Sequence, residues 1–178
     1  TANVENGKWN NYGSAFANTD WFDFYFKDAT LRHTHNLSVT GGSEKINFYV
    51  GLGYTYQEGL LDVVDDNLSK YNVNTKLQAT ANKWLKFNFN NNITLNILKR
   101  PMPNQTIFYA TLGQALPNAP THYPVDSEYG DASEFRYFKE SHYVENRISD
   151  AMTFTATVTP LPGWDIVGDM EVRFDVED

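Results

Sequence analysis

Two groups of side chains in this 178-residue sequence could hold a metal ion. His33 and His35 lie two residues apart, so on a strand they project from one face and could share a metal with a third ligand. The alternative is that both are ordinary residues of that face. Asp62, Asp65 and Asp66 offer oxygen ligands for calcium but lack EF-hand spacing, so a solvated acidic loop competes with that interpretation. We predict no metal from either group.

Motifs for catalysis are missing from the sequence. It contains no G-x-S-x-G, no H-E-x-x-H and no phosphate-binding glycine loop. There is no cysteine, which excludes thiol catalysis, thiolate zinc sites and disulfides. A net charge of −8 and a pI near 4.9 disfavour a phosphate backbone as partner. We therefore predict that the protein is not an enzyme, has no cofactor and binds no nucleic acid.

Aromatic residues make up 15% of the chain, and several lie in its irregular parts. An aromatic ring with a polar edge offers a flat apolar surface on which a sugar can stack. On this basis we predict five substrate-binding residues: Trp9, Trp21, Tyr109, Tyr123 and Tyr129. The competing interpretation is that these rings pack the loops or contact a partner protein.

The elements that would position these residues have a period of two, which is typical of strands with two different faces. From 31 to 40, for example, Leu37 and Val39 share a face that excludes Asn36 and Ser38. The same alternation predicts six strands, at 31–40, 46–57, 68–81, 84–97, 152–159 and 164–175. On the fourth strand, Asn91 is a polar exception on the apolar face. Tyr54, Tyr56, Tyr71 and Trp84 are candidates for the aromatic girdles found at membrane interfaces, with core packing as the alternative.

Connections between the predicted strands alternate between tight and long. Turns are expected at 41–44, where glycine would supply positive φ angles, at 82–83 and at 160–163. Longer connections are expected at 58–67 and at 98–150, the second of which shows no sustained period. Before the strands, Asn18 or Thr19 could cap a short helix through residues 21–26.

Strand length and patterning together favour a membrane barrel. Tilted strands of roughly 9–11 residues cross a bilayer, and the faces must be apolar toward lipid and polar toward a water-filled interior. The mean hydropathy is −0.51, and no apolar stretch is long enough for a membrane helix. We predict an all-β fold, an antiparallel transmembrane β-barrel segment of about six long strands. Since so few strands cannot close, further strands must complete it. A soluble β-sandwich that binds glycans remains the alternative, because one buried sheet face gives the same alternation.

Three motifs carry a family resemblance. They are Asn18-Thr19-Asp20-Trp21, the run His35-Asn36-Leu37-Ser38-Val39-Thr40-Gly41-Gly42-Ser43-Glu44-Lys45, and Phe48-Tyr49-Val50-Gly51-Leu52-Gly53-Tyr54 with Gln57-Glu58-Gly59. Through them the chain resembles SusC/RagA-type TonB-linked outer-membrane transporters of bacteria. The similarity is specific over residues 18–58, fair over 68–97 and weak from 98 onward.

The resemblance implies early strands of a 22-stranded barrel with an N-terminal plug, energised through TonB. It implies import of oligosaccharides or peptides with a SusD-like surface lipoprotein, in contact with outer-membrane lipid. Residues 1–30 would be an extracellular loop with a short helix, 31–97 four barrel strands, 98–150 a long extracellular loop and 151–178 two barrel strands. No plug or TonB-box segment is expected within this sequence, so the segment alone could not transport. A non-transporting adhesin barrel is a third hypothesis.

Overall fold

The structure, a computed structural model, describes residues 4–5, 8–9, 18–101, 105–119, 121 and 142–178. The chain forms two compact units. One comprises Thr1–Thr30, Glu58–Asn67 and Lys99–Val144, and is called the loop unit below. The other comprises Leu31–Gln57, Leu68–Leu98 and Glu145–Asp178, and is called the sheet unit.

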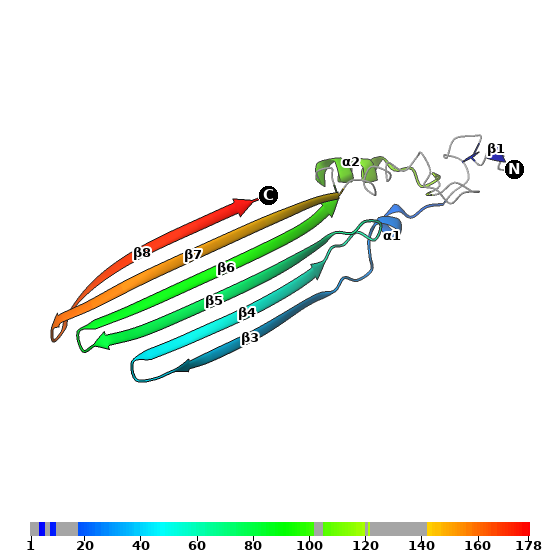
Figure 1. Cartoon of the computed structure of the whole chain (residues 1–178). Helices are drawn as coiled ribbons and strands as arrows, with labels where there is room; N and C mark the ends of the chain where they lie inside the picture. Colours follow the sequence, from blue (N-terminus) through cyan, green and yellow to red (C-terminus); the bar gives the residue numbers. More distant parts are fainter. Residues whose placement is uncertain (1–3, 6–7, 10–17, 102–104, 120, 122–141) are drawn as a thin grey trace. The chain divides into compact units, whose positions relative to one another are not determined.

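One antiparallel sheet of six strands dominates the chain, and the strands lie side by side in sequence order from β3 to β8 (Figure 1). Their bounds are β3 Arg32–Gly42, β4 Ile46–Glu58, β5 Asn67–Asn82, β6 Leu85–Pro101, β7 His142–Leu161 and β8 Trp164–Glu177. The shortest has 11 residues and the longest 20, well above the usual 5–6 or so. The predicted all-β antiparallel fold with about six long strands is confirmed.

The register of the sheet preserves the two faces that the alternation predicts. Leu37 pairs with Leu52 and Val39 with Val50, while Ser38 pairs with Gly51 between them. At the other edge, Phe154 pairs with Met170 and Thr155 with Asp169. Each strand therefore has an apolar and a polar row, and these rows continue across strand boundaries as two faces.

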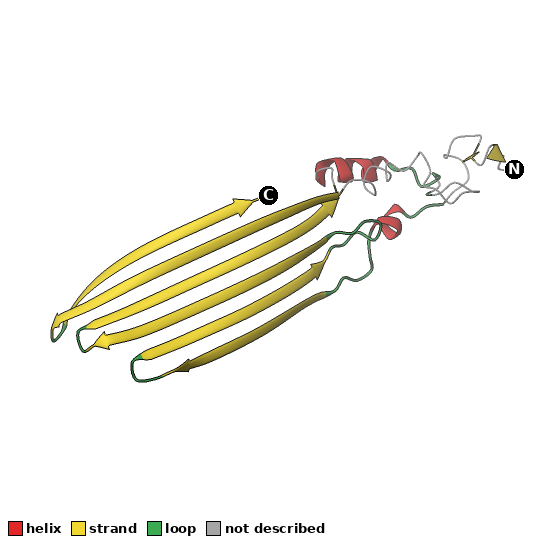
Figure 2. Cartoon of the chain, in the orientation of Figure 1, coloured by secondary structure: helices red, strands yellow, loops and turns green. Residues whose placement is uncertain are grey.

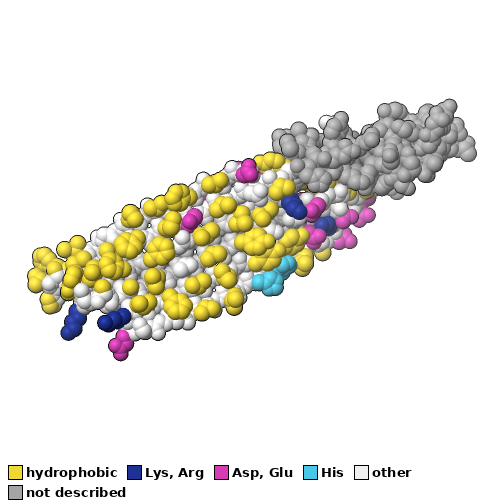
Figure 3. Space-filling view, in the orientation of Figure 1, with side chains coloured by type: hydrophobic (Ala, Val, Ile, Leu, Met, Phe, Trp, Pro, Cys, Tyr) yellow, Lys and Arg dark blue, Asp and Glu magenta, His cyan; other side chains and the backbone are white. Residues whose placement is uncertain are grey.

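Large hydrophobic side chains on the apolar face are exposed rather than buried. Leu37 is 64% exposed, Ile166 60% and Met170 61%. Figure 3 shows hydrophobic side chains spread over the sheet in this way. Within the sheet unit no second layer of strands covers this face. The described sheet is thus a single layer and not the two-layer sandwich that was the alternative.

Turns between the strands differ in detail from the prediction. Gly41 and Gly42 lie inside β3, paired with Phe48 and Asn47, and the turn follows at 43–45 with Ser43 N–H donating to Ile46 O. Positive φ was expected there, but among the described glycines only Gly163 has it, at 85° in the β7–β8 turn. Gly41 serves close packing instead, because an added Cβ would lie 2.7 Å from the Phe48 ring.

Strand β7 begins well before the position that the pattern predicts. Its first ten residues, 142–151, precede Met152 and include Glu145, Arg147 and Asp150, whose charges obscure the period. The helix α2, Gln105–Gln114, was also missed, within a region that shows no sustained period. The sequence of this helix has no apolar stripe with a period of 3.6.

Besides these elements the loop unit contains the short strands β1 Val4–Glu5 and β2 Lys8–Trp9, which pair antiparallel, and the helix α1, Trp21–Tyr25 (Figure 2). The predicted short helix is therefore present. Its cap is neither Asn18 nor Thr19 but Asp20, whose carboxylate accepts from Phe22 and Asp23 N–H. No helix in the described ranges has both the length and the apolar character to cross a membrane.

Candidate functional site

The polar face of β3–β7 carries two shallow hollows, whose polar lining side chains we call the amide wall. The first has a volume of about 420 Å³. Its polar side chains are Asn36, Ser38, Tyr49, Lys70, Asn72, Asn74, Asn92 and Thr94. The second, of about 400 Å³, adds Asn47, Lys76, Gln78, Asn88, Asn90 and Thr155. The alternation of each strand places these side chains on one face, and no carboxylate is found among the described residues that line either hollow.

Glycines give the first hollow its depth. A Cβ at Gly51 would lie 2.6 Å from the Tyr49 hydroxyl, so the phenol lies over this position. A Cβ at Gly53 would lie 3.1 Å from Asn36 Oδ1 and 3.3 Å from Asn72 Nδ2. Two neighbouring strands thus direct side-chain amides toward the gap that Gly53 leaves. Any larger residue there would occupy the space between them.

Hydrogen-bonding groups on the amide wall form a row across four strands. Asn36 on β3 and Asn72 on β5 flank Gly53 of β4, and the Thr94 hydroxyl on β6 donates to Asn72 Oδ1 at 3.4 Å. In the second hollow the Lys76 ammonium lies 6.0 Å from the centre of the Tyr49 ring, within reach of a cation–π contact. The wall therefore offers donors, acceptors and a positive charge to whatever lies against it.

Strand β8 gives the same face an acidic edge. Asp169 accepts from the Thr155 hydroxyl at 2.6 Å, and Asp175 accepts from the Ser149 hydroxyl at 2.5 Å. Glu171 forms an ion pair with Arg173 at 2.7 Å. These carboxylates are exposed yet held by hydroxyl or guanidinium groups of their own sheet.

The apolar face carries a patch of stacked rings on β3–β5. His33 stacks on Tyr56 with ring centres 5.4 Å apart, and His35 is parallel to Tyr54 at 6.4 Å. Tyr54 contacts Tyr71 at 4.9 Å. The ring centres of His33 and His35 are 5.1 Å apart. Across the described residues no group of three His, Cys, Asp or Glu side chains is placed to hold a metal.

An aromatic core forms in the loop unit. Trp21 and Tyr25 of α1 are 6% and 2% exposed and pack with Leu112 and Ala119. Trp21 stacks on Tyr25 with ring centres 5.9 Å apart, and its Nε1–H donates to Leu116 O at 2.9 Å. This hydrogen bond and the aromatic packing join the segment before β3 to the segment after α2.

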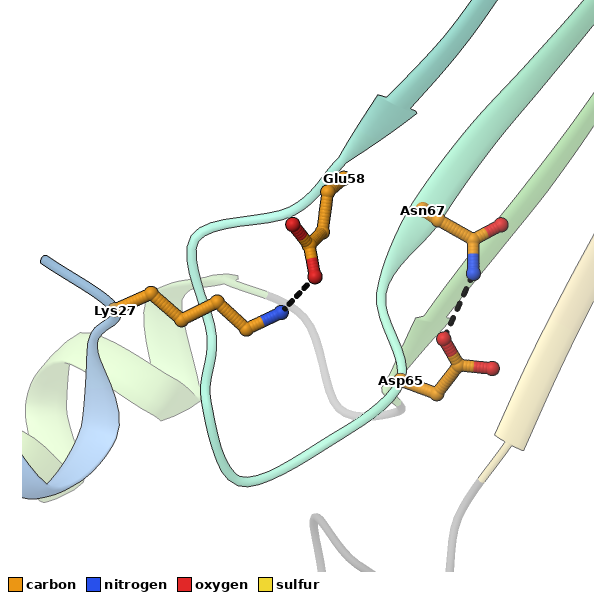
Figure 4. Close-up of polar contacts among 4 residues, drawn as sticks. All are labelled: Lys27, Glu58, Asp65 and Asn67. Carbon is orange, nitrogen blue, oxygen red and sulfur yellow. Dashed lines mark hydrogen bonds and ion pairs between the residues drawn. The ribbon is translucent and has the colours of Figure 1, made fainter. Parts of the chain in front are cut away.

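The 58–67 connection is joined to the α1 segment by a polar contact. The Lys27 ammonium lies 2.8 Å from Glu58 Oε1, and Asn67 Nδ2 donates to Asp65 Oδ1 at 2.8 Å (Figure 4). The hydrogen bond from Lys27 to Glu58 raises the pKa of that lysine. Burial raises the pKa of the Asp66 carboxyl, which lies against Gly59. Glu58 and Asp65 therefore stabilise this connection through their contacts with Lys27 and Asn67.

Of the five residues predicted to bind substrate, the structure describes the side chains of Trp21 and Tyr109. Trp21 belongs to the buried core, whereas Tyr109 on α2 is 61% exposed. Trp9 lies on β2, and nothing is described of its side chain. Tyr123 and Tyr129 fall outside the described residues. A sugar-stacking role stays a prediction for each of them, and for Trp21 it would require the core to open.

The amide wall is not among the sites predicted from sequence. The alternating asparagines of β5 and β6 predict a polar face there. Their placement at every second position, with Lys70 and Lys76 among them, could have indicated a binding surface. Which of them meet across strands depends on register, and the sequence pattern does not supply register.

Comparison with known proteins gives relatives in sequence and in structure. TonB-dependent receptor P26 of Formosa agariphila is 30% identical over 122 residues, which is 68% of this chain and 11% of that protein. TonB-dependent receptor SusC of Bacteroides thetaiotaomicron is 35% identical over 75 residues, or 42% of this chain and 7% of that protein. The chain thus spans about a tenth of the length of these relatives. No protein-family model matches it.

Two solved structures share the fold at 18% sequence identity. The RagAB peptide transporter superposes with a TM-score of 0.67 over 90% of this chain and 19% of that one. The RagAB peptide importer in its closed-closed state superposes with a TM-score of 0.63, over 98% of this chain and 20% of that one. Because the sequence matches and the fold agree on one type of protein, the comparisons confirm the resemblance: this chain corresponds to a stretch of β-barrel strands of the SusC/RagA type of TonB-linked outer-membrane transporter.

Proposed function

We propose that the chain forms part of the barrel wall of a TonB-dependent outer-membrane importer of glycans or peptides. The observation that carries this proposal is the pair of unlike faces on one layer of long strands. Leu37 and Met170 expose apolar surface on one face while the amide wall covers the other. A soluble protein rarely exposes so large an apolar area, whereas lipid requires it.

Closure of the wall requires strands beyond β3 and β8. An open sheet edge in lipid leaves unpaired N–H and C=O groups, each costing several kcal/mol or so. Further strands of the same barrel would pair with these two edges. The number of 22 strands implied by the family resemblance is part of the proposal.

Orientation follows from the lengths of the connections. The tight turns at 43–45, 83–84 and 162–163 would face the periplasm, as short turns do in outer-membrane barrels. Segments 1–30, 58–67 and 98–150 would then be extracellular. A SusD-like surface lipoprotein would work with the importer on that side, and TonB would act through a plug region elsewhere in the protein.

Substrate contact in the extracellular segments is proposed for Trp9, Trp21, Tyr109, Tyr123 and Tyr129. The exposed ring of Tyr109 supports this role. Trp21 could take it only after leaving the contacts that it makes with Tyr25 and Leu116. The proposal for Trp21 is therefore also a proposal that the core opens when substrate binds.

Fractionation of native cells, followed by an uptake assay, tests the proposal. The parent protein should stay with the outer membrane and require detergent for release. Cells lacking the parent gene should lose uptake of a labelled oligosaccharide or peptide pool, and cells lacking TonB should lose the same uptake. Recovery in the aqueous fraction without detergent would instead support the soluble glycan-binding module. Membrane recovery with unchanged uptake would support a non-transporting barrel.

A further inference from the structure

Charge is divided unevenly over the polar face of the sheet. The amide wall includes Lys70 and Lys76 and has no carboxylate among its lining residues. Acidic residues of this face lie at the β7–β8 edge of the sheet, and Asp169, Glu171 and Asp175 are on β8 itself. A chain with a net charge of −8 thus keeps one part of its polar face positive.

The acidic edge has partners in its own sheet, and the two lysines have none of opposite charge. Asp169 and Asp175 accept hydrogen bonds from Thr155 and Ser149, and Glu171 pairs with Arg173. Among the described residues, Lys70 and Lys76 form no ion pair, and the Lys76 ammonium lies over the ring of Tyr49. A ligand that brings negative charge to the amide wall would meet positive charge that the sheet leaves unpaired.

Amide side chains favour a particular kind of ligand. Asn36, Asn72, Asn74 and Asn92 each offer two donors and an acceptor oxygen, which complement hydroxyl groups that both donate and accept. An extended peptide is most often bound by adding a strand to a free sheet edge. The amide wall lies on the face of paired strands, so its backbone cannot recognise a peptide in that way.

We propose that the amide wall binds an acidic oligosaccharide, with sugar hydroxyls on the asparagines and carboxylate or sulfate groups near Lys70 and Lys76. This inference deepens the proposed function, since it requires the polar face to line the interior of the importer. The amide wall is separate in sequence from the five aromatic residues predicted to bind substrate, and the inference assigns a substrate class to this wall.

Binding to the purified full-length transporter that contains this segment provides the test. The probes are tetrasaccharides of galacturonate, of guluronate and of sulfated galactose, each beside its neutral counterpart after carboxyl reduction or desulfation. Tetraglutamate serves as an acidic peptide. Calorimetry in detergent measures binding without energised transport. Loss of uptake in cells therefore tests the proposed function, and this assay tests the ligand class separately.

At least one acidic tetrasaccharide should bind about tenfold more tightly than its neutral counterpart, as expected for two lysines of which Lys76 is exposed and Lys70 half-buried. The double variant Lys70→Gln/Lys76→Gln should remove that preference, whereas Lys45→Gln/Lys83→Gln, in the turns, should retain it. A transporter that binds no acidic tetrasaccharide, prefers the neutral forms, binds tetraglutamate equally well, or keeps its preference in the Lys70/Lys76 variant would overturn the inference. If the variant does not fold, adding salt to the unmodified protein must weaken acidic but not neutral binding.

Discussion

The loop unit and the sheet unit use hydrophobic side chains in opposite ways. In the loop unit Trp21, Tyr25, Leu112 and Ala119 are buried against one another, as in any water-soluble core. The sheet unit instead leaves residues such as Leu37, 64% exposed, without an apolar partner layer. Hydrophobic patterning alone therefore does not define a core, because the medium outside the protein decides whether an apolar residue must be covered.

Truncating the loop-unit core should have the largest effect. Trp21→Ala removes the stacking on Tyr25 and the hydrogen bond to Leu116 and leaves a cavity, at a local cost of about 3–5 kcal/mol. Hydrogen exchange in the full-length protein should show lost protection at 19–26 and 112–119. Phe22→Ala is the control, since Phe22 is 67% exposed. Equal loss in both variants would mean that this cluster does not stabilise the unit.

A charge on the apolar face should come next. Leu37→Arg places a guanidinium toward lipid and should cost about 2–4 kcal/mol of folding free energy near the bilayer midplane. Ser38→Arg, one residue along and on the polar face, should cost far less. Refolding into lipid vesicles, followed by gel mobility of the folded barrel, measures the difference. If both variants fold equally well, the assignment of the two faces is wrong.

Two strand glycines on the apolar face give a smaller and sharper contrast. Gly41→Val meets the Phe48 ring, which must move, and we expect a cost of about 1–2 kcal/mol from overpacking. At Gly168, paired with Ala156, nothing lies within 4 Å of an added Cβ. Gly168→Val should therefore be neutral or stabilising by strand propensity. The measurement is the denaturant midpoint of each variant folded in vesicles. Equal midpoints for Gly41→Val and Gly168→Val would contradict the close packing at Gly41.

Asp66 should give the smallest change, in the loop unit and with a defined pH dependence. Its folded pKa is raised by burial, so the carboxyl binds a proton more readily when folded and its unfavourable contribution disappears as pH falls. At neutral pH, Asp66→Asn should slow hydrogen exchange at the Gly59 amide, which donates to Asp66 O. This added protection should vanish when the pH is well below 3.8, the ordinary pKa of the carboxyl. Asp62→Asn is the exposed control, and a gain that persists in acid would rule out this cause.

Much of the sheet could be predicted because a period of two is a local property of the chain. Residues such as Leu37 and Asn36 alternate wherever the backbone is extended, so the existence of the strands and their two faces followed from sequence. The start of β7 did not, since Glu145, Arg147 and Asp150 are compatible with a strand only once neighbours pair with it. The family resemblance also followed from local motifs at residues 18–58.

Contacts between distant segments decided the rest. Trp21 is predicted from sequence to stack on sugar, but it is buried against Leu112 and Ala119, and its indole N–H donates to Leu116, 95 residues away. Asn36, Asn72 and Thr94 form one row only through the register of four strands. The sequence by itself determined which residues are apolar and how often they recur. The tertiary structure decided which of them are covered and which polar groups meet, because those contacts are not encoded in any local period.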